Sequence, residues 1–281
     1  MSRARAQGLT ARALLYAVVT LAAFTMVIPF FWMVSASLKD MKEIFVVPPA
    51  WIPPGPTLDA YYKLFEVVPF GLYGWNSVKI ALLNTAGMLI ACSLGAYGFA
   101  RLPFPGKDAL FAVLLATMMV PGPITLIPTF ILFTQFGWVG THLPLIVPAF
   151  FGGAFGTFLL RQFFLTIPQD LVDAARVDGA GPLRIFVSLF VPLSKPALAT
   201  LAVLVFVGNW NNFLGPLVYG RRPELFTLTV GLTFLMRGSQ QMTYWNQVMA
   251  GAVISITPMI IIFLSAQKYF VRGIVTTGLK G

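Results

Sequence analysis

Long apolar stretches that lack Asp, Glu, Lys and Arg are the main pattern along this chain. They cover residues 13–38, 80–100, 109–160, 196–220 and 238–267. A helix needs roughly 20 apolar residues to cross the hydrocarbon layer of a membrane. The third stretch is long enough for two crossings joined near residues 135–145. The pattern therefore predicts an all-α integral membrane protein with about six transmembrane helices.

The limits of these stretches predict the positions of the spans within a single domain covering residues 1–281. We place the spans at about 13–36, 78–100, 109–133, 143–165, 197–219 and 246–267. Residues 44–58 are also apolar, but their five prolines cannot sustain a helix. They fall in an expected external loop at 37–76, and a second external loop is expected at 220–245. A cytoplasmic loop is expected at 169–196, between the fourth and fifth spans.

Composition supports the membrane class and excludes several kinds of chemistry. Of the 281 residues, 58% are hydrophobic and 10% are charged, whereas soluble domains carry roughly 25% charged residues. Cys92 and His142 are the only residues of their types. A disulfide framework within the chain and a Cys- or His-based metal cluster are thus excluded. We expect no metal site and no catalytic residues.

The distribution of basic residues predicts the orientation in the membrane. The formal net charge is +10, but the basic residues are scattered singly between apolar tracts and form no stripe for nucleic acid. If the amino terminus is cytoplasmic, twelve of the 19 Lys and Arg residues fall on the inner side. Because loops rich in Lys and Arg stay inside, both termini are expected in the cytoplasm.

The charged loop at 169–196 has the pattern of a helix, a turn and a second helix. Acidic Asp170 and Asp173 suit the positive end of the first helix dipole, Gly179 suits the turn, and Pro182 suits the first turn of the second helix. Leu171, Ala174 and Ala175 would give the first helix an apolar face. A short amphipathic helix at the membrane surface is physically suited to sit in a groove of another protein. The alternative is an ordinary amphipathic hairpin.

This loop resembles the EAA loop of ABC importer membrane subunits. That pattern consists of E-A-A, a D-G pair, a distant aromatic residue and a closing P-L-x-x-P. The corresponding positions here are Asp173, Ala174, Ala175, Asp178, Gly179, Phe186, Pro192, Leu193 and Pro196. Asp173 departs from the usual Glu; it keeps the negative charge but shortens the side chain by one methylene.

The resemblance extends over nearly the whole chain and points to the carbohydrate-uptake group, on the side of the maltose-type second permease. The segments that carry it are PFFWMVSASLKD (29–40), PPAWIPPGPTLDAY (48–61), NSVKIA (76–81), AYGFARLPFPGK (96–107), FLLRQFF (158–164), WNNFLGPL (210–217) and QKYFVRGIVTTGLKG (267–281).

The resemblance implies a permease subunit in the bacterial cytoplasmic (inner) membrane that moves a sugar or oligosaccharide inward. The implied partners are a second homologous permease, an extracytoplasmic substrate-binding protein and two ABC ATPase subunits that hold ATP and Mg. The residues it implies for coupling to the ATPases are Asp173, Ala174, Ala175, Arg176, Asp178, Gly179, Phe186, Pro192 and Pro196. The sequence contains no G-x-x-x-x-G-K-[ST] phosphate-binding loop. We therefore expect no ATPase activity and no cofactor in this chain itself.

Two further groups of residues are candidates for binding. The polar run Asn209, Trp210, Asn211 and Asn212 lies in the fifth expected span, where polar groups are costly unless they are paired or line a cavity. It is a candidate substrate pathway, and interhelical packing is the alternative. The external loop supplies candidate contacts to the binding protein, for which a solvated connector is the alternative. These are Arg237, Gln240, Gln241 and Trp245.

Two other functional classes compete with the importer. An ion-coupled secondary carrier also needs many spans, but it usually places ionisable residues inside the membrane. The six expected tracts contain none, apart from Lys79 at a boundary. A polytopic membrane enzyme would need a nucleophile and base or a metal, for which one His and one Cys offer little material. Sugars, glycosides and glycerol phosphates all remain open as the cargo.

Overall fold

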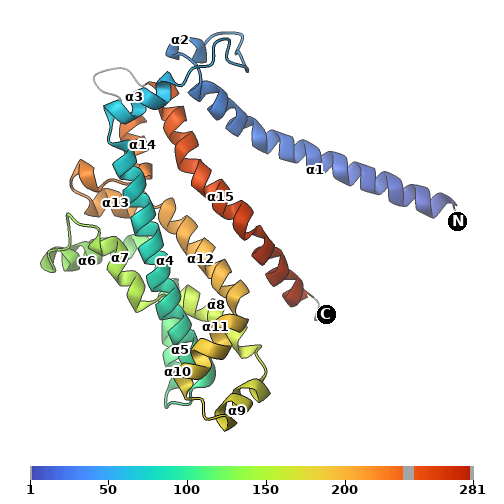
Figure 1. Ribbon diagram of the computed structural model, residues 1–281, viewed down its shortest axis with the longest axis vertical. Coiled ribbons are helices and arrows are strands. Elements are labelled where there is room, and N and C mark those ends of the chain that lie inside the picture. The colour runs from blue at the N-terminus through green and yellow to red at the C-terminus, as the bar shows by residue number, and fades with distance from the viewer. Residues whose placement is uncertain (1, 237–243, 279–281) are drawn as a thin grey trace. The chain divides into compact units, whose positions relative to one another are not determined.

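The structure, a computed structural model, describes residues 2–236 and 244–278 and contains helices but no strand within those ranges (Figure 1). The α-helices in chain order are α1 (Ser2–Ser37), α2 (Met41–Ile44), α3 (Asp59–Val67), α4 (Phe70–Arg101), α5 (Lys107–Ala116), α6 (Gly122–Gln135), α7 (Leu143–Ile146), α8 (Ala154–Leu165), α9 (Gln169–Val177), α10 (Pro182–Ile185), α11 (Val191–Leu193), α12 (Lys195–Trp210), α13 (Leu214–Tyr219), α14 (Leu228–Met236) and α15 (Trp245–Gly278). Between them lie the 3-10 turns η1 (Thr117–Met119), η2 (Val147–Phe151) and η4 (Pro223–Leu225), and the π-helical η3 (Phe186–Phe190). The predicted all-α class is confirmed.

Length and composition identify the helical segments that can cross a membrane. Four qualify on their own within the described residues: Arg12–Ser37, Phe70–Arg101, Leu143–Leu165 and Trp245–Ser265. Two bent pairs qualify if each is counted as one span: Lys107–Met119 with Gly122–Gln135, bent by 100°, and Pro182–Leu193 with Lys195–Trp210, bent by 79°. The described chain thus holds four to six candidate spans, and the upper figure equals the number expected from the sequence.

Prolines account for both bends. Pro121 separates η1 from α6, and Val120 before it is extended, as a residue preceding proline prefers. At the second bend, Ser194 leaves helical geometry and Pro196 follows within the first turn of α12. Proline lacks the backbone N–H that would continue the helical hydrogen bonds. A pattern of apolar residues does not reveal where such a helix turns.

Several helix bounds differ from the expected spans and loops. Helix α4 begins at Phe70 rather than near residue 78, because Lys79 was treated as a boundary although the helix continues through it. The span expected at 197–219 is interrupted after Trp210, and a separate helix, α13, follows. The expected external loops contain helices of their own, α3 in 37–76 and α14 in 220–245.

The contacts of the chain group into two compact units. Unit 1 comprises Met1–Phe70 and Leu232–Ile256, and unit 2 comprises Gly71–Gly231 and Thr257–Gly281. The sequence suggested one domain because it contains no linker. The boundaries fall inside α4, α14 and α15, so continuous helices leave no linker for the sequence to reveal.

Within unit 1, hydrogen bonds join the segment that follows α1 to the end of that helix. The Ser35 hydroxyl donates to the Trp51 carbonyl at 2.6 Å. Lys39 is 1% exposed; its ammonium donates to the carbonyl of Ala50 and lies 4.3 Å from the centre of the Trp32 ring. The proline-rich stretch is therefore held in place by its backbone carbonyls, while most of its side chains remain exposed.

The core of unit 2 is formed by α4, α8, η3 and α12. Its buried members include Cys92, Ala96, Tyr97, Ala100, Leu160, Phe164, Ile167, Val172, Ile185, Phe186, Phe190, Ala197 and Leu201. Helices α4 and α8 approach closely at Gly156, where an added Cβ would lie 2.7 Å from the Cys92 sulfur. Helices α9 and α10 lie at the C-terminal end of α4, so this core supports them directly (Figure 1).

Candidate functional site

The predicted helix-turn-helix is present and has a defined turn geometry. Helix α9 follows Pro168, and Gly179 has a φ of +79°, which glycine adopts without a steric penalty. The Gly179 amide donates to the Arg176 carbonyl, and the Ala180 amide donates to the Ala175 carbonyl, both at 2.9 Å. This pair of bonds is a Schellman motif, which ends the helix. The chain then turns into α10, which begins with a proline in its first turn.

Helix α9 has an inner face and an outer face. Val172 is only 1% exposed and belongs to the core of unit 2, where Ala175 packs beside it. Leu171, Ala174 and Val177 are exposed, and Val177 is 88% exposed. The expected apolar face of Leu171, Ala174 and Ala175 is not formed, because Leu171 and Ala174 are exposed whereas Ala175 is partly buried against the core. Positions 172 and 175 point inward, and positions 171 and 174 point outward.

The charged side chains of α9 bind to one another. One carboxylate oxygen of Asp173 accepts from Arg176 at 3.2 Å and from Gln169 at 3.0 Å. Both members of the Asp173–Arg176 pair are about half exposed, at 55% and 52%. An exposed pair of this kind contributes little to stability. Its effect is to orient the carboxylate along the surface of α9. Asp178, at the end of the helix, is exposed.

The second half of the loop is anchored by aromatic residues. Phe186 is buried, and its ring centre lies 5.3 Å from that of Tyr97 on α4. Phe190 packs edge-on against both Tyr97 and Phe164, at 4.9 and 5.3 Å. Pro192 lies exposed in α11, and Pro196 lies partly buried in the first turn of α12. The loop is thus attached to the bundle through the π-helical turn η3.

Arg101, the last residue of α4, joins this aromatic cluster to the start of α9. One terminal nitrogen donates to the carbonyls of Phe164, at 2.7 Å, and Ile167, and the other donates to the Gln169 side chain at 2.8 Å. The centre of the guanidinium lies 5.4 Å from the Phe190 ring. The sequence does not reveal this role of Arg101, because its hydrogen-bond partners are more than 60 positions away.

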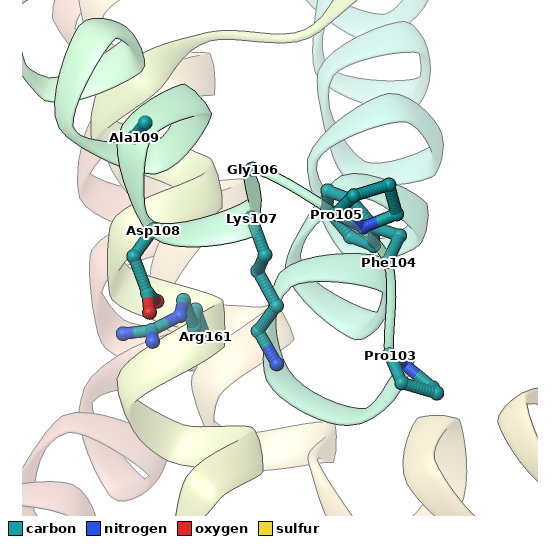
Figure 2. A pocket seen from close by; sticks show the side chains of 8 residues that line it. All are labelled: Pro103, Phe104, Pro105, Gly106, Lys107, Asp108, Ala109 and Arg161. Atoms are coloured by element: carbon teal, nitrogen blue, oxygen red, sulfur yellow. The ribbon is translucent and has the colours of Figure 1, made fainter.

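A second polar feature of unit 2 is an open pocket of about 740 Å³ beside the loop between α4 and α5. Figure 2 shows its lining, which includes Lys107 and Asp108 of α5 and Arg161 of α8. The Arg161 Nε donates to the Phe99 carbonyl at 3.2 Å, and its guanidinium lies 4.2 Å from the Phe111 ring centre. Among the described residues, no three His, Cys, Asp or Glu side chains form a group that could hold a metal ion.

The polar run of the candidate substrate pathway lies where α12 ends. The Asn209 amide donates to the Asn84 side chain at 2.9 Å and to the Val205 carbonyl at 2.8 Å. Trp210 is buried and stacks on Phe206, with ring centres 5.6 Å apart. The side chains of Asn209 and Trp210 therefore make contacts with helices of unit 2.

Asn211 and Asn212 have different surroundings. Asn211 is exposed, and within the described residues its amide donates only along its own helix, to the Val207 carbonyl at 3.0 Å. The Asn212 oxygen accepts from the Gly215 amide at 3.1 Å, where α13 begins. Asn212 thus satisfies a backbone group at a helix start, whereas Asn211 has an exposed amide available to a ligand.

Most candidate contacts to a binding protein cannot be placed. Arg237, Gln240 and Gln241 lie outside the described residues. Trp245 is the first residue of α15, and its ring packs edge-on against Phe45 in unit 1, with centres 6.4 Å apart.

These features define a helical membrane protein that carries a surface helix-turn-helix on a packed bundle. The family described as binding-protein-dependent transport system inner membrane component matches residues 84–276. The chain belongs to this family. It is a permease subunit of a binding-protein-dependent ABC importer and a multi-pass protein of the bacterial inner membrane. Such subunits are transport components rather than ATPases.

Relatives and a solved structure agree with this assignment. The sn-glycerol-3-phosphate transport system permease protein UgpE of Yersinia enterocolitica is 34% identical, over 86% of this chain and 88% of the relative. The lactose transport system permease protein LacG of Rhizobium radiobacter is 35% identical, over 92% and 93%. A chain of a bacterial ABC transporter that imports the acidic polysaccharide alginate has a TM-score of 0.83 and 25% identity, over 96% of this chain and 99% of that chain.

Proposed function

We propose that this chain and a second homologous permease together form a pathway for a carbohydrate. Two partner ABC ATPases, which hold ATP and Mg, supply the energy, and an extracytoplasmic binding protein delivers the substrate. Helix α9 is the contact between this chain and one ATPase. The residues assigned to this contact are Asp173, Ala174, Arg176, Asp178 and Gly179, which are exposed. Ala175, which packs against the core, supports them together with Phe186, Pro192 and Pro196.

The division of α9 into two faces is the observation that carries this proposal. Val172 fixes the helix to its own bundle, whereas Leu171, Ala174 and Val177 are left exposed. An exposed apolar side chain gains roughly 25 cal/mol per Å² when a partner covers it. A helix that is packed on its own bundle through one face and exposes apolar side chains on the other is suited to lie in a groove of a soluble subunit.

The anchoring explains how movement of α9 reaches the spans. When nucleotide binding draws the ATPases together, α9 is displaced with them. Packed side chains transmit such a displacement because protein interiors are dense and stiff. Here the route runs from Val172 into the core that contains Phe186, Phe190 and Tyr97, and so into α4 and α8. Hydrolysis then resets the arrangement.

The assignment of a carbohydrate rests on the relatives. Their names specify sn-glycerol-3-phosphate and lactose, and the solved transporter imports alginate. All three are rich in hydroxyl groups. A second alginate transporter structure, 16% identical with a TM-score of 0.66, contains a periplasmic protein bound to an alginate pentasaccharide. The exposed amide of Asn211 is the candidate group for hydroxyl recognition within the membrane.

The test is uptake by the reconstituted complex in vesicles that contain ATP. We expect uptake of a labelled sugar to require ATP, the ATPases and the binding protein, and to persist when a protonophore is added. Uptake by this chain alone, or loss of uptake with the protonophore, would instead favour an ion-coupled carrier. Val177→Asp tests α9 directly, because it places a charge on the exposed apolar face; the ATPases should then no longer copurify.

A further inference from the structure

The Arg101 side chain makes hydrogen bonds to three residues outside its own helix. Its two terminal nitrogens bind the carbonyls of Phe164 and Ile167 and the side chain of Gln169. Its Nε is buried and has no hydrogen-bond partner among the described residues. The terminal nitrogens, which project furthest from α4, therefore make all the hydrogen bonds of this side chain.

The contacts continue along α9. Gln169 accepts from Arg101 and donates to Asp173, and Asp173 also accepts from Arg176. Four side chains thus form one continuous series from the last residue of α4 to the last turn of α9. Asp173 occupies the position where the EAA pattern has glutamate, and the shorter carboxylate remains within reach of Gln169, one helical turn earlier.

The same guanidinium also closes the end of α8. The carbonyls of Phe164 and Ile167 lie at and just beyond the C-terminus of α8, where carbonyls lack partners within the helix. A cation at this end is favourable because the helix dipole is negative there. The corner between α8 and α9 is consequently fixed to α4 through one side chain.

We propose that Arg101 is a positioning residue for transport, which links α9 to span α4 through Gln169. The inference rests on the proposed contact between α9 and the ATPase, and it adds a route to α4 that is separate from packing at Val172. Only a planar guanidinium presents two nitrogens at fixed spacing. Lysine has a single ammonium and does not span the two carbonyls and the glutamine in the same way.

The experiment compares Arg101→Gln, Arg101→Lys and Gln169→Ala in the reconstituted complex. Three quantities are measured: copurification of the ATPases, basal ATP hydrolysis, and uptake per complex. We expect copurification and basal hydrolysis to stay within about twofold of the unaltered complex, while uptake falls about tenfold in both Arg101 variants, since hydrogen bonds to charged groups are the stronger ones. Gln169→Ala should lower uptake by a smaller factor than the two Arg101 variants. Gln162→Ala is the matched control, because Gln162 on α8 is exposed and its side chain makes no hydrogen bond in the described part of the chain.

Each outcome bears on a different claim. Normal uptake in Arg101→Lys would overturn the positioning role, because charge alone would then suffice. If both Arg101 variants fail to assemble, Gln169→Ala decides, since it removes only the two exposed side-chain hydrogen bonds to Arg101 and Asp173; unchanged uptake in that variant overturns the proposal. Failure of the unaltered chain to bind or stimulate the ATPases would instead refute the proposed function itself.

Discussion

The side chains of Asn84 and Asn209 are joined by a hydrogen bond of 2.9 Å between residues 125 positions apart. Asn84 lies in the middle of α4, and Asn209 lies near the end of α12. The Asn84 amide also donates to the Leu145 carbonyl in α7 at 2.8 Å. This pair thus connects three helical segments of unit 2. Its geometry favours packing as the role of Asn209, the alternative left open by the sequence.

Replacement of Asn209 by alanine should lower stability. The change leaves the Asn84 oxygen without its partner, and interhelical hydrogen bonds in membranes contribute about 1 kcal/mol. We expect a lower thermal midpoint in detergent and uniformly reduced uptake of all substrates. Asn211→Ala is the matched variant, because the Asn211 amide donates along its own helix, to the Val207 carbonyl. It should retain stability and change the relative uptake of different sugars. An altered substrate preference in the Asn209 variant would argue for direct substrate contact.

The two valines of α9 provide a second matched pair. Val172→Ala should destabilise the protein by about 1.5 kcal/mol, because two buried methyl groups are lost. Val177→Ala should leave stability unchanged, because that side chain is 88% exposed. Its expected effect is weaker retention of the ATPases on an affinity column. Equal loss of stability in both variants, measured by thermal unfolding, would contradict the division into inner and outer faces.

Gly179 should tolerate residues according to their backbone preferences. A Cβ at this position would meet nothing within 4 Å, so steric contact is not the cost of substitution. The cost comes from the φ of +79°, on the order of 1 kcal/mol for alanine and less for asparagine. Proline cannot adopt this angle. We expect uptake to decrease in the order Gly, Asn, Ala, Pro while insertion into the membrane is retained. Normal uptake with proline would exclude a role for this turn.

His142 should make stability depend on pH. It lies just before α7, and its Nε2 donates to the Leu225 carbonyl at 3.0 Å. Burial lowers the pKa of His142 below its usual 6.5, and nearby Lys79 lowers it further, although the bond to Leu225 opposes the shift. The unfolded chain therefore binds a proton first as the pH falls below 6.5. The contribution of His142 to the free energy of unfolding should be fully present above that pH. It should decline below it, until the folded chain is protonated as well.

The variant His142→Gln tests this pH dependence. A glutamine amide can donate to the same carbonyl but does not titrate. We expect the thermal midpoint of the variant to vary less than that of the unaltered chain between about pH 8 and pH 5. An identical pH profile for the two proteins would show that another group is responsible.

Local patterns in the sequence were sufficient for much of the architecture. The apolar stretches predicted a helical membrane protein, because every backbone group in lipid must be satisfied within the element itself. The turn at Gly179 and the helix start at Pro182 also followed from the sequence, since both depend on the backbone preferences of single residues. The sequence placed the start of α4 too late, because Lys79 was treated as the boundary of the span. A lysine within a helix can lay its apolar stem along the helix surface and keep its ammonium in water.

The tertiary structure decided which side chains meet. Nothing near Arg101 in the sequence indicates that it binds the carbonyl of Ile167 and the side chain of Gln169, and nothing near Asn84 indicates Asn209. The two valines of α9 are chemically identical, so only packing shows that Val172 is the anchor. Sequence thus determined the class, the helices and the turn, because these depend on local periodicity and backbone geometry. The contacts between distant positions depend on how the helices pack, which local periodicity does not encode.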